Sequence, residues 1–142
     1  MKRLHNLSDA DFVLETGCGL IIIEYKNAII PGATNPDAFN PLDDKKINSV
    51  IRKYYDTLHY LKLVQKDGPK RFVYIVEVEH GDVVMRNRLR NRLTQELPFK
   101  LQNDLNTGIK LIEEIDVLSI AEWNSHPEYR DFPFVQLSER QQ

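Results

Sequence analysis

The chain has 142 residues, of which 42% are hydrophobic and 28% charged, and this composition excludes a disordered chain. Its length fits a single domain spanning 1–142. The net charge of -2 excludes nucleic-acid binding through an overall positive charge, so such binding requires local basic clusters. One cysteine excludes an intramolecular disulfide, and apolar runs such as 20–23 are far too short to cross a bilayer. We therefore expect a cytoplasmic protein without a membrane partner.

The spacing of apolar residues predicts strands and helices along the chain. Short β-branched runs predict strands, and apolar residues three and four positions apart predict helices. In chain order, the predicted elements are a β-hairpin around 12–23, a loop over 31–41, a helix over 43–66, a strand over 72–78, a helix over about 83–97, and one or two strands over 109–120. The order β-β-α-β-α-β predicts an α/β fold with a mixed central sheet flanked by helices.

The end of the chain is polar and contains prolines. This composition predicts a C-terminal tail over about 124–142. Four aromatic residues lie in or just before this region, and they are expected either to cover the core or to contact a second subunit: Trp123, Tyr129, Phe132 and Phe134.

The hairpin turn determines which residues face each other. With Gly17 and Cys18 at the turn, the numbers of paired residues sum to 35, which places Asp11 opposite Glu24. Side chains alternate between the two faces of a strand, so Asp11, Glu24 and Lys26 project from one face. Two opposed carboxylates repel each other, and a divalent cation compensates because hard cations take carboxylate oxygens as ligands.

Asp11 on the first strand and Glu24-Tyr25-Lys26 on the second resemble the PD-(D/E)xK nuclease superfamily, also called restriction-endonuclease-like. The resemblance is specific over 11–26 and extends in element order over roughly 9–80. It implies a restriction-endonuclease-like core in which Asp11, Glu24 and the main-chain carbonyl of Tyr25 hold Mg²⁺ or Mn²⁺. It also implies a metal-dependent nuclease acting on DNA, with Asp11, Glu24 and Lys26 as the catalytic residues.

Two features depart from the family pattern. Ala10 stands where a proline usually precedes the first acid, and only about ten residues precede the hairpin, where the family core begins with a helix and a strand. We therefore expect a homo-oligomer or a subunit of a larger complex. The main alternative is a non-catalytic nucleic-acid-binding or accessory subunit, and a protein-interaction domain is another.

A plainer interpretation of the hairpin remains open. In it, Glu24 and Lys26 are solvent-facing charges at the end of a strand, and Asp11 is a capping or turn residue. Residues 13–19 also resemble the glycine-rich first motif of S-adenosylmethionine-dependent methyltransferases, but that motif requires a helix after the turn, which the β-branched residues there disfavour.

Arginines crowd the second predicted helix. Arg86 and Arg90 share one face, and Arg88 and Arg92 share another. Arginine suits contacts with phosphate, so under the nuclease hypothesis these four residues bind the DNA backbone, together with Arg52 on the first predicted helix. The alternative is a solvated helix face with acidic residues from elsewhere in the chain nearby.

Overall fold

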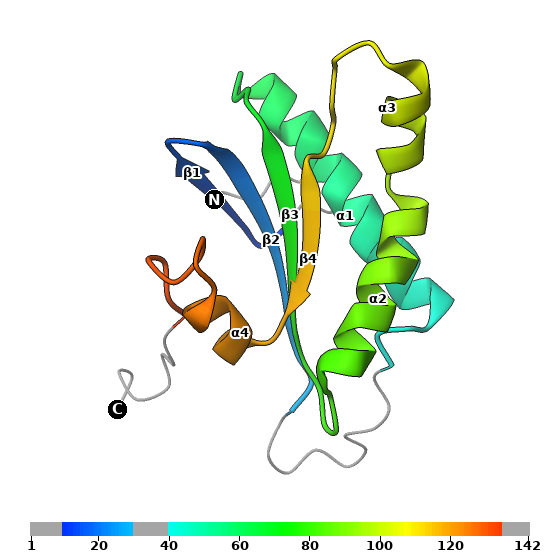
Figure 1. Ribbon diagram of the computed structural model, residues 1–142, viewed down its shortest axis with the longest axis vertical. Helices are drawn as coiled ribbons and strands as arrows, with labels where there is room; N and C mark the ends of the chain where they lie inside the picture. Colours follow the sequence, from blue (N-terminus) through cyan, green and yellow to red (C-terminus); the bar gives the residue numbers. More distant parts are fainter. Residues whose placement is uncertain (1–9, 30–39, 135–142) are drawn as a thin grey trace.

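The computed structural model describes residues 10–29 and 40–134 (Figure 1), so most of the predicted loop lies outside the described residues. The elements in chain order are β1 (Phe12–Thr16), β2 (Gly19–Asn27), α1 (Asp44–Leu63), β3 (Lys70–Glu77), α2 (Val83–Glu96), α3 (Phe99–Leu105), β4 (Glu114–Leu118) and α4 (Ile120–Ser125). The predicted α/β class and the mixed central sheet are confirmed. The short helices α3 and α4 were not predicted.

The four strands form one open sheet in the order β1-β2-β3-β4. β1 pairs with β2 in antiparallel fashion, from Phe12 opposite Ile23 to Thr16 opposite Gly19, which is the predicted register. β3 is parallel to both β2 and β4. The side chain of Thr16 stabilises the turn, since its hydroxyl accepts a hydrogen bond from the Cys18 N–H and donates one to the Gly19 carbonyl. Because a strand follows this turn, the helix required by a methyltransferase motif is absent there.

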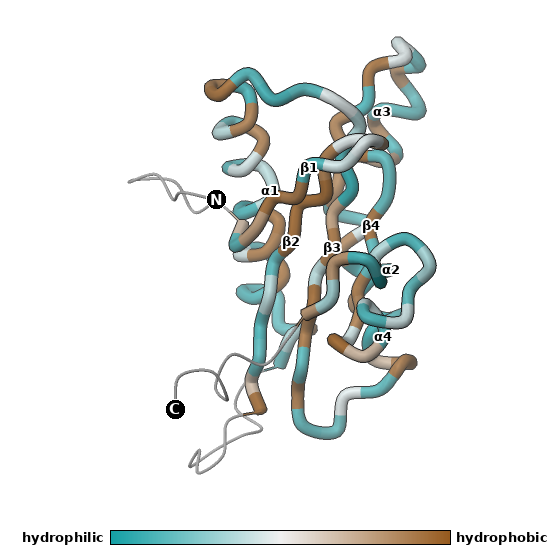
Figure 2. The backbone as a smooth tube through the Cα atoms, turned by 90° about the vertical axis from the view of Figure 1, so that its left-hand side faces the viewer, coloured by the Kyte–Doolittle hydropathy of each residue, from teal (hydrophilic) through white to brown (hydrophobic). Residues whose placement is uncertain are grey.

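Helices cover both faces of the sheet. α1 and α2 lie on one face and α4 lies on the other (Figure 1). Alternate residues of β2 serve the two layers: Leu20 and Ile22 pack in the larger core beneath α1 and α2, whereas Ile21 and Ile23 pack against α4 and the segment after it. The hydrophobic stretch of β2, brown in Figure 2, is therefore buried from both sides.

Helix α1 begins where the sequence predicts but ends before its predicted last residue. The carboxylate of Asp43 caps the helix by accepting a hydrogen bond from the Lys45 N–H. The helix was predicted to continue to residue 66 but ends at Leu63. Gln65 has a φ of 59°, in the left-handed region, and this conformation ends the helix before the predicted stop.

The last part of the chain differs most from expectation. The strand or strands predicted over 109–120 are a single strand, β4, and the residues just before it are irregular. Residues 124–134, expected to be a tail, pack on the sheet. Trp123 and Tyr129 are fully buried with their rings stacked 4.4 Å apart, and the Trp123 indole N–H donates to the Phe132 carbonyl at 2.7 Å. Trp123, Tyr129 and Phe134 therefore cover the core, which was one of the two expectations, whereas Phe132 is 41% exposed.

Candidate functional site

The hairpin brings Asp11 and Glu24 together. Asp11 directly precedes β1, and its Oδ2 accepts a hydrogen bond of 2.9 Å from the main-chain N–H of Tyr25. Burial raises the pKa of Glu24, and the negative charge of nearby Asp11 raises it further. The charge of Asp11 thus acts on the Glu24 carboxylate, in keeping with the predicted pairing of the two residues.

Glu24 is a buried charge in the interior layer beneath α1. Only 5% of the residue is exposed, so the interpretation of Glu24 as a solvent-facing charge is wrong. Its Oε2 lies 2.7 Å from the ammonium nitrogen of Lys53, and the hydrogen bond and positive charge of Lys53 oppose the rise in the Glu24 pKa. Its Oε1 is buried and has no hydrogen-bond partner among the described residues. A buried polar atom of this kind calls for an explanation, such as a bound water or a bound ion.

Helix α1 also fixes the residue that precedes Asp11. The hydroxyl of Thr57 accepts a 2.7 Å hydrogen bond from the Ala10 N–H and donates one of 2.7 Å to the Lys53 carbonyl. Thr57 is fully buried and lies one helical turn after Lys53. One face of α1 therefore sets the positions of both acidic residues of the hairpin.

Tyr74 lies beside Glu24 on the neighbouring strand. The two residues are partners in the parallel register of β2 and β3, and Tyr74 is 2% exposed. Burial raises the pKa of the Tyr74 hydroxyl, and the charges of Glu24 and Asp11 raise it further. Tyr74 is therefore a neutral phenol at physiological pH. The sequence did not point to it, because a parallel register between distant strands cannot be read from local spacing.

Lys26 and Tyr25 follow Glu24 on β2. Alternation along the strand places Lys26 on the same face as Glu24, and its side chain is exposed. Tyr25 is on the other face, where its ring centroid lies 5.8 Å from that of Phe134. Asp11, Glu24 and Lys26 are thus gathered at one end of the hairpin, although Glu24 is far more buried than Lys26.

These residues offer a modest set of metal donors. No cluster of three or more His, Cys, Asp or Glu side chains suited to a metal occurs in residues 10–29 and 40–134. The hairpin supplies two carboxylates, and the predicted third donor is the main-chain carbonyl of Tyr25. The unpartnered Oε1 of Glu24 fits this donor set, because hard divalent cations take carboxylate oxygens and complete their shells with carbonyls and water.

Most arginines predicted to bind DNA have partners within the protein. The contacts are Arg52 with Asp56 at 3.6 Å, Arg86 with Glu122 at 2.5 Å, Arg90 Nε with the Ile115 carbonyl at 3.1 Å, and Arg92 with Asp44 at 3.0 Å and Glu96 at 2.6 Å. Arg86 is the least exposed of the paired arginines, with 13% of its side chain accessible. Arg86 and Arg92 thus fit the alternative to DNA binding, in which acidic residues from elsewhere in the chain balance the arginines of the helix. Arg88 is exposed and makes no ion pair with a described residue.

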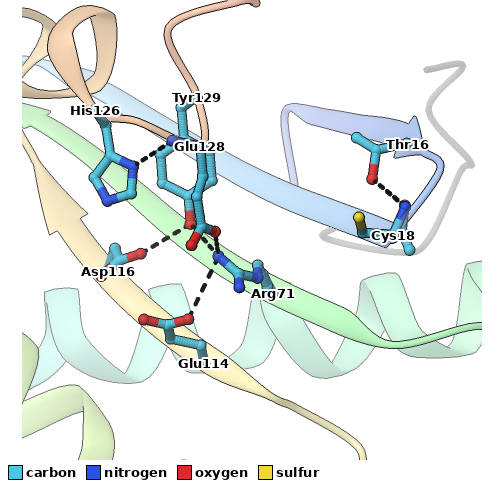
Figure 3. A network of polar contacts seen from close by, with 9 residues as sticks. Thr16, Cys18, Arg71, Glu114, Asp116, His126, Glu128 and Tyr129 are labelled. Carbon is cyan, nitrogen blue, oxygen red and sulfur yellow. Dashed lines mark hydrogen bonds and ion pairs between the residues drawn. The ribbon is translucent and has the colours of Figure 1, made fainter.

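A second polar cluster lies at the other end of the sheet (Figure 3). Arg71, near the start of β3, pairs with Glu128 and lies 3.4 Å from Glu114, while the Tyr129 hydroxyl donates to Asp116 at 2.8 Å. Arg71, Glu128 and Tyr129 line a cleft of about 620 Å³ beside the hairpin turn, and Glu24 is not part of it. The cluster holds the segment after α4 against the sheet, and it was not predicted from the sequence.

No helix of the described residues combines the length and apolar character needed to cross a membrane. Comparisons with protein-family models, curated proteins and solved structures give no match for this chain. Any functional assignment therefore rests on the residues themselves, and above all on Asp11, Glu24 and Lys53.

Proposed function

We propose that the chain is a metal-dependent phosphodiesterase, a nuclease that acts on DNA. The observation that carries the proposal is the Glu24 carboxylate, which is buried beside the negatively charged Asp11 and has one oxygen without a partner among the described residues. A carboxylate in this position costs free energy unless something binds it. Lys53 offsets part of that cost through Oε2, and a divalent cation shared with Asp11 would offset more of it.

In this proposal each residue of the hairpin has a separate role. Asp11, Glu24 and the Tyr25 carbonyl would hold Mg²⁺ or Mn²⁺, which would supply Lewis-acid activation of a phosphate and of a water molecule. Lys26, exposed at the rim, orients the attacking water or stabilises charge on the phosphate. Asp11 already orients its carboxylate through the Tyr25 N–H, so this ligand is held in place before an ion arrives.

The wider proposal includes a restriction-endonuclease-like core and contacts to DNA. The antiparallel hairpin, the helix after it and the following parallel strand are compatible with such a core. Arg88 and Arg52 have exposed side chains, as contacts with phosphate require. β1 is an edge strand whose Phe12 is 44% exposed, which supports a further protein partner or a second copy at this edge.

The proposal is tested by incubating the purified protein with linear and supercoiled DNA in Mg²⁺ or Mn²⁺. We expect cleavage by the wild-type protein, loss of cleavage in Lys26→Ala and Glu24→Gln, and unchanged cleavage in Lys62→Ala, which alters an exposed lysine of α1. Circular dichroism establishes that each variant is folded. Cleavage that persists in Lys26→Ala or Glu24→Gln would show that the nuclease is a contaminant or uses another site.

A non-catalytic nucleic-acid-binding or accessory subunit is the second candidate. It is favoured by the contact between Lys53 and Glu24, because an ammonium group already neutralises the buried carboxylate without a metal. This candidate predicts salt-dependent DNA binding that weakens in Arg88→Ala, without cleavage and without any effect of Mn²⁺ on stability. Measurement of thermal stability with and without Mn²⁺ distinguishes the two candidates, since only a metal-binding protein is stabilised.

A further inference from the structure

Lys53 reaches the predicted metal site from a different element of the fold. It lies on α1, and its ammonium nitrogen is 2.7 Å from Oε2 of Glu24, a length typical of a charge-assisted hydrogen bond. The Lys53 side chain is 24% exposed, whereas that of Glu24 is 6% exposed. The pair is therefore largely shielded from solvent, and its geometry is set by the packing of α1 on the sheet.

The two oxygens of Glu24 have different environments. Oε2 accepts the hydrogen bond from Lys53, and Oε1 is buried without a partner among the described residues. A carboxylate with both oxygens unbound rotates about its terminal torsion, which is broad in glutamate. The hydrogen bond to Oε2 restricts this rotation and leaves Oε1 buried beside Asp11, whose main-chain N–H also favours the charged carboxylate.

The same face of α1 fixes the second carboxylate. Thr57 joins the Lys53 carbonyl to the Ala10 N–H, and Ala10 precedes Asp11. The Asp11 carboxylate is in turn held by the Tyr25 N–H. The relative position of the two acidic side chains thus depends on Lys53 and Thr57 of one helix as well as on the hairpin itself.

We propose that Lys53 is a positioning residue of the metal site, an inference that rests on the proposed function. It keeps hold of Oε2 when the ion is bound, so that Oε1 of Glu24 and the carboxylate of Asp11 are presented to the cation. Hydrogen-bond partners of metal ligands contribute to affinity in this way, and their removal weakens metal binding by roughly 10- to 100-fold. Lys53 acts through Glu24 and does not itself contact the ion.

The test measures Mn²⁺ binding to the full chain by calorimetry and electron paramagnetic resonance, independently of any cleavage. We expect Lys53→Met to weaken binding by roughly 10- to 100-fold, Lys53→Arg to recover most of the affinity, and Lys62→Met to bind like the wild type. Lys53→Met that binds as tightly as the wild type, or more tightly, overturns the positioning role. In the second case Lys53 competes with the ion for Glu24.

A measurement on the unaltered protein avoids any loss of fold in Lys53→Met. In the ¹⁵N spectrum of its lysine side chains, we expect the Lys53 ammonium signal to stay protected from exchange when Mg²⁺ is added. Loss of that protection means that the ion displaces Lys53 and overturns the inference. Glu24→Gln separates this result from the proposed function: if the wild type binds no Mn²⁺, or Glu24→Gln binds it equally well, the metal site itself is wrong.

Discussion

Replacing Lys53 with methionine removes the ammonium group that lies 2.7 Å from Oε2 of Glu24 and keeps a side chain of similar length. Removing one partner of a buried ion pair costs about 3–5 kcal/mol, because a buried charge is left without compensation. The Lys53 side chain is 24% exposed, so solvent reaches the pair from one side and we expect the lower end, about 3 kcal/mol. At about 3 °C per kcal/mol for a domain of this size, Tm falls by about 9 °C.

Urea unfolding in metal-free buffer at pH 7 measures this loss. The single tryptophan, Trp123, is fully buried, so its fluorescence reports unfolding directly. Lys62→Met, which alters an exposed lysine on the same helix, is the matched control and should stay within about 0.5 kcal/mol of the wild type. A double-mutant cycle with Glu24→Gln should give a coupling energy of about 2 kcal/mol. A loss below about 0.5 kcal/mol for Lys53→Met, or a coupling near zero, would refute the buried pair.

Three further results are expected. Gly19 has a φ of 137°, and a Cβ there would lie 2.3 Å from the Pro69 carbonyl oxygen. Gly19→Ala should therefore lower the unfolding free energy, measured in urea, by more than about 1 kcal/mol. Gly17→Ala, whose Cβ would meet nothing within 4 Å, should lower it less. Trp123→Ala empties the centre of the smaller core and should lower the unfolding free energy by about 3–5 kcal/mol, measured by circular dichroism. The folded-state pKa of Glu24 lies above its ordinary value of 4.5, so the folded protein binds the proton more readily than the unfolded chain does. The contribution of Glu24 to stability should therefore fall as the pH rises from 4.5 through the folded-state pKa. Glu24→Gln should lose this pH dependence, and an identical profile in both proteins would contradict it.

The hairpin was predictable because its geometry is local. A two-residue turn at Gly17 and Cys18 fixes the whole register, and Phe12 lies opposite Ile23 as that turn requires. The proximity of Asp11 to Glu24 follows from the same register. The first residues of α1 and α2 were also predictable from the sequence, because an aspartate caps each helix.

The contact between Lys53 and Glu24 depends on information that local spacing does not contain. The residues are 29 positions apart, and the angle at which α1 crosses the sheet decides which of its basic residues reaches Glu24. Arg52, the neighbour of Lys53 that was predicted to bind the DNA backbone, has a 72% exposed side chain and lies beside Asp56 on its own helix. A shift of one residue along a helix rotates the side chain by about 100°, which separates a buried position from a solvated one.

The C-terminal segment shows a different limit. Its polar composition suggested a tail, yet Trp123 and Tyr129 bury their rings against β2 and β3. These two residues are six positions apart and belong to a short helix and the turn after it, so no helical or strand period marks them. Composition counts the many polar residues equally with the few aromatic ones, although the aromatic ones contribute most of the packing.

The burial of Glu24 is difficult to explain by stability alone. Its position belongs to the strand face that packs beneath α1, where Leu20 and Ile22 occupy the equivalent positions along β2. Replacing a buried ion pair with well-packed hydrophobic residues is often neutral or stabilising, so an apolar residue at position 24 would serve the core at least as well. The fold therefore does not require a carboxylate at this point. A buried carboxylate next to Asp11 and held by Lys53 is what the proposed cation site would require at this position.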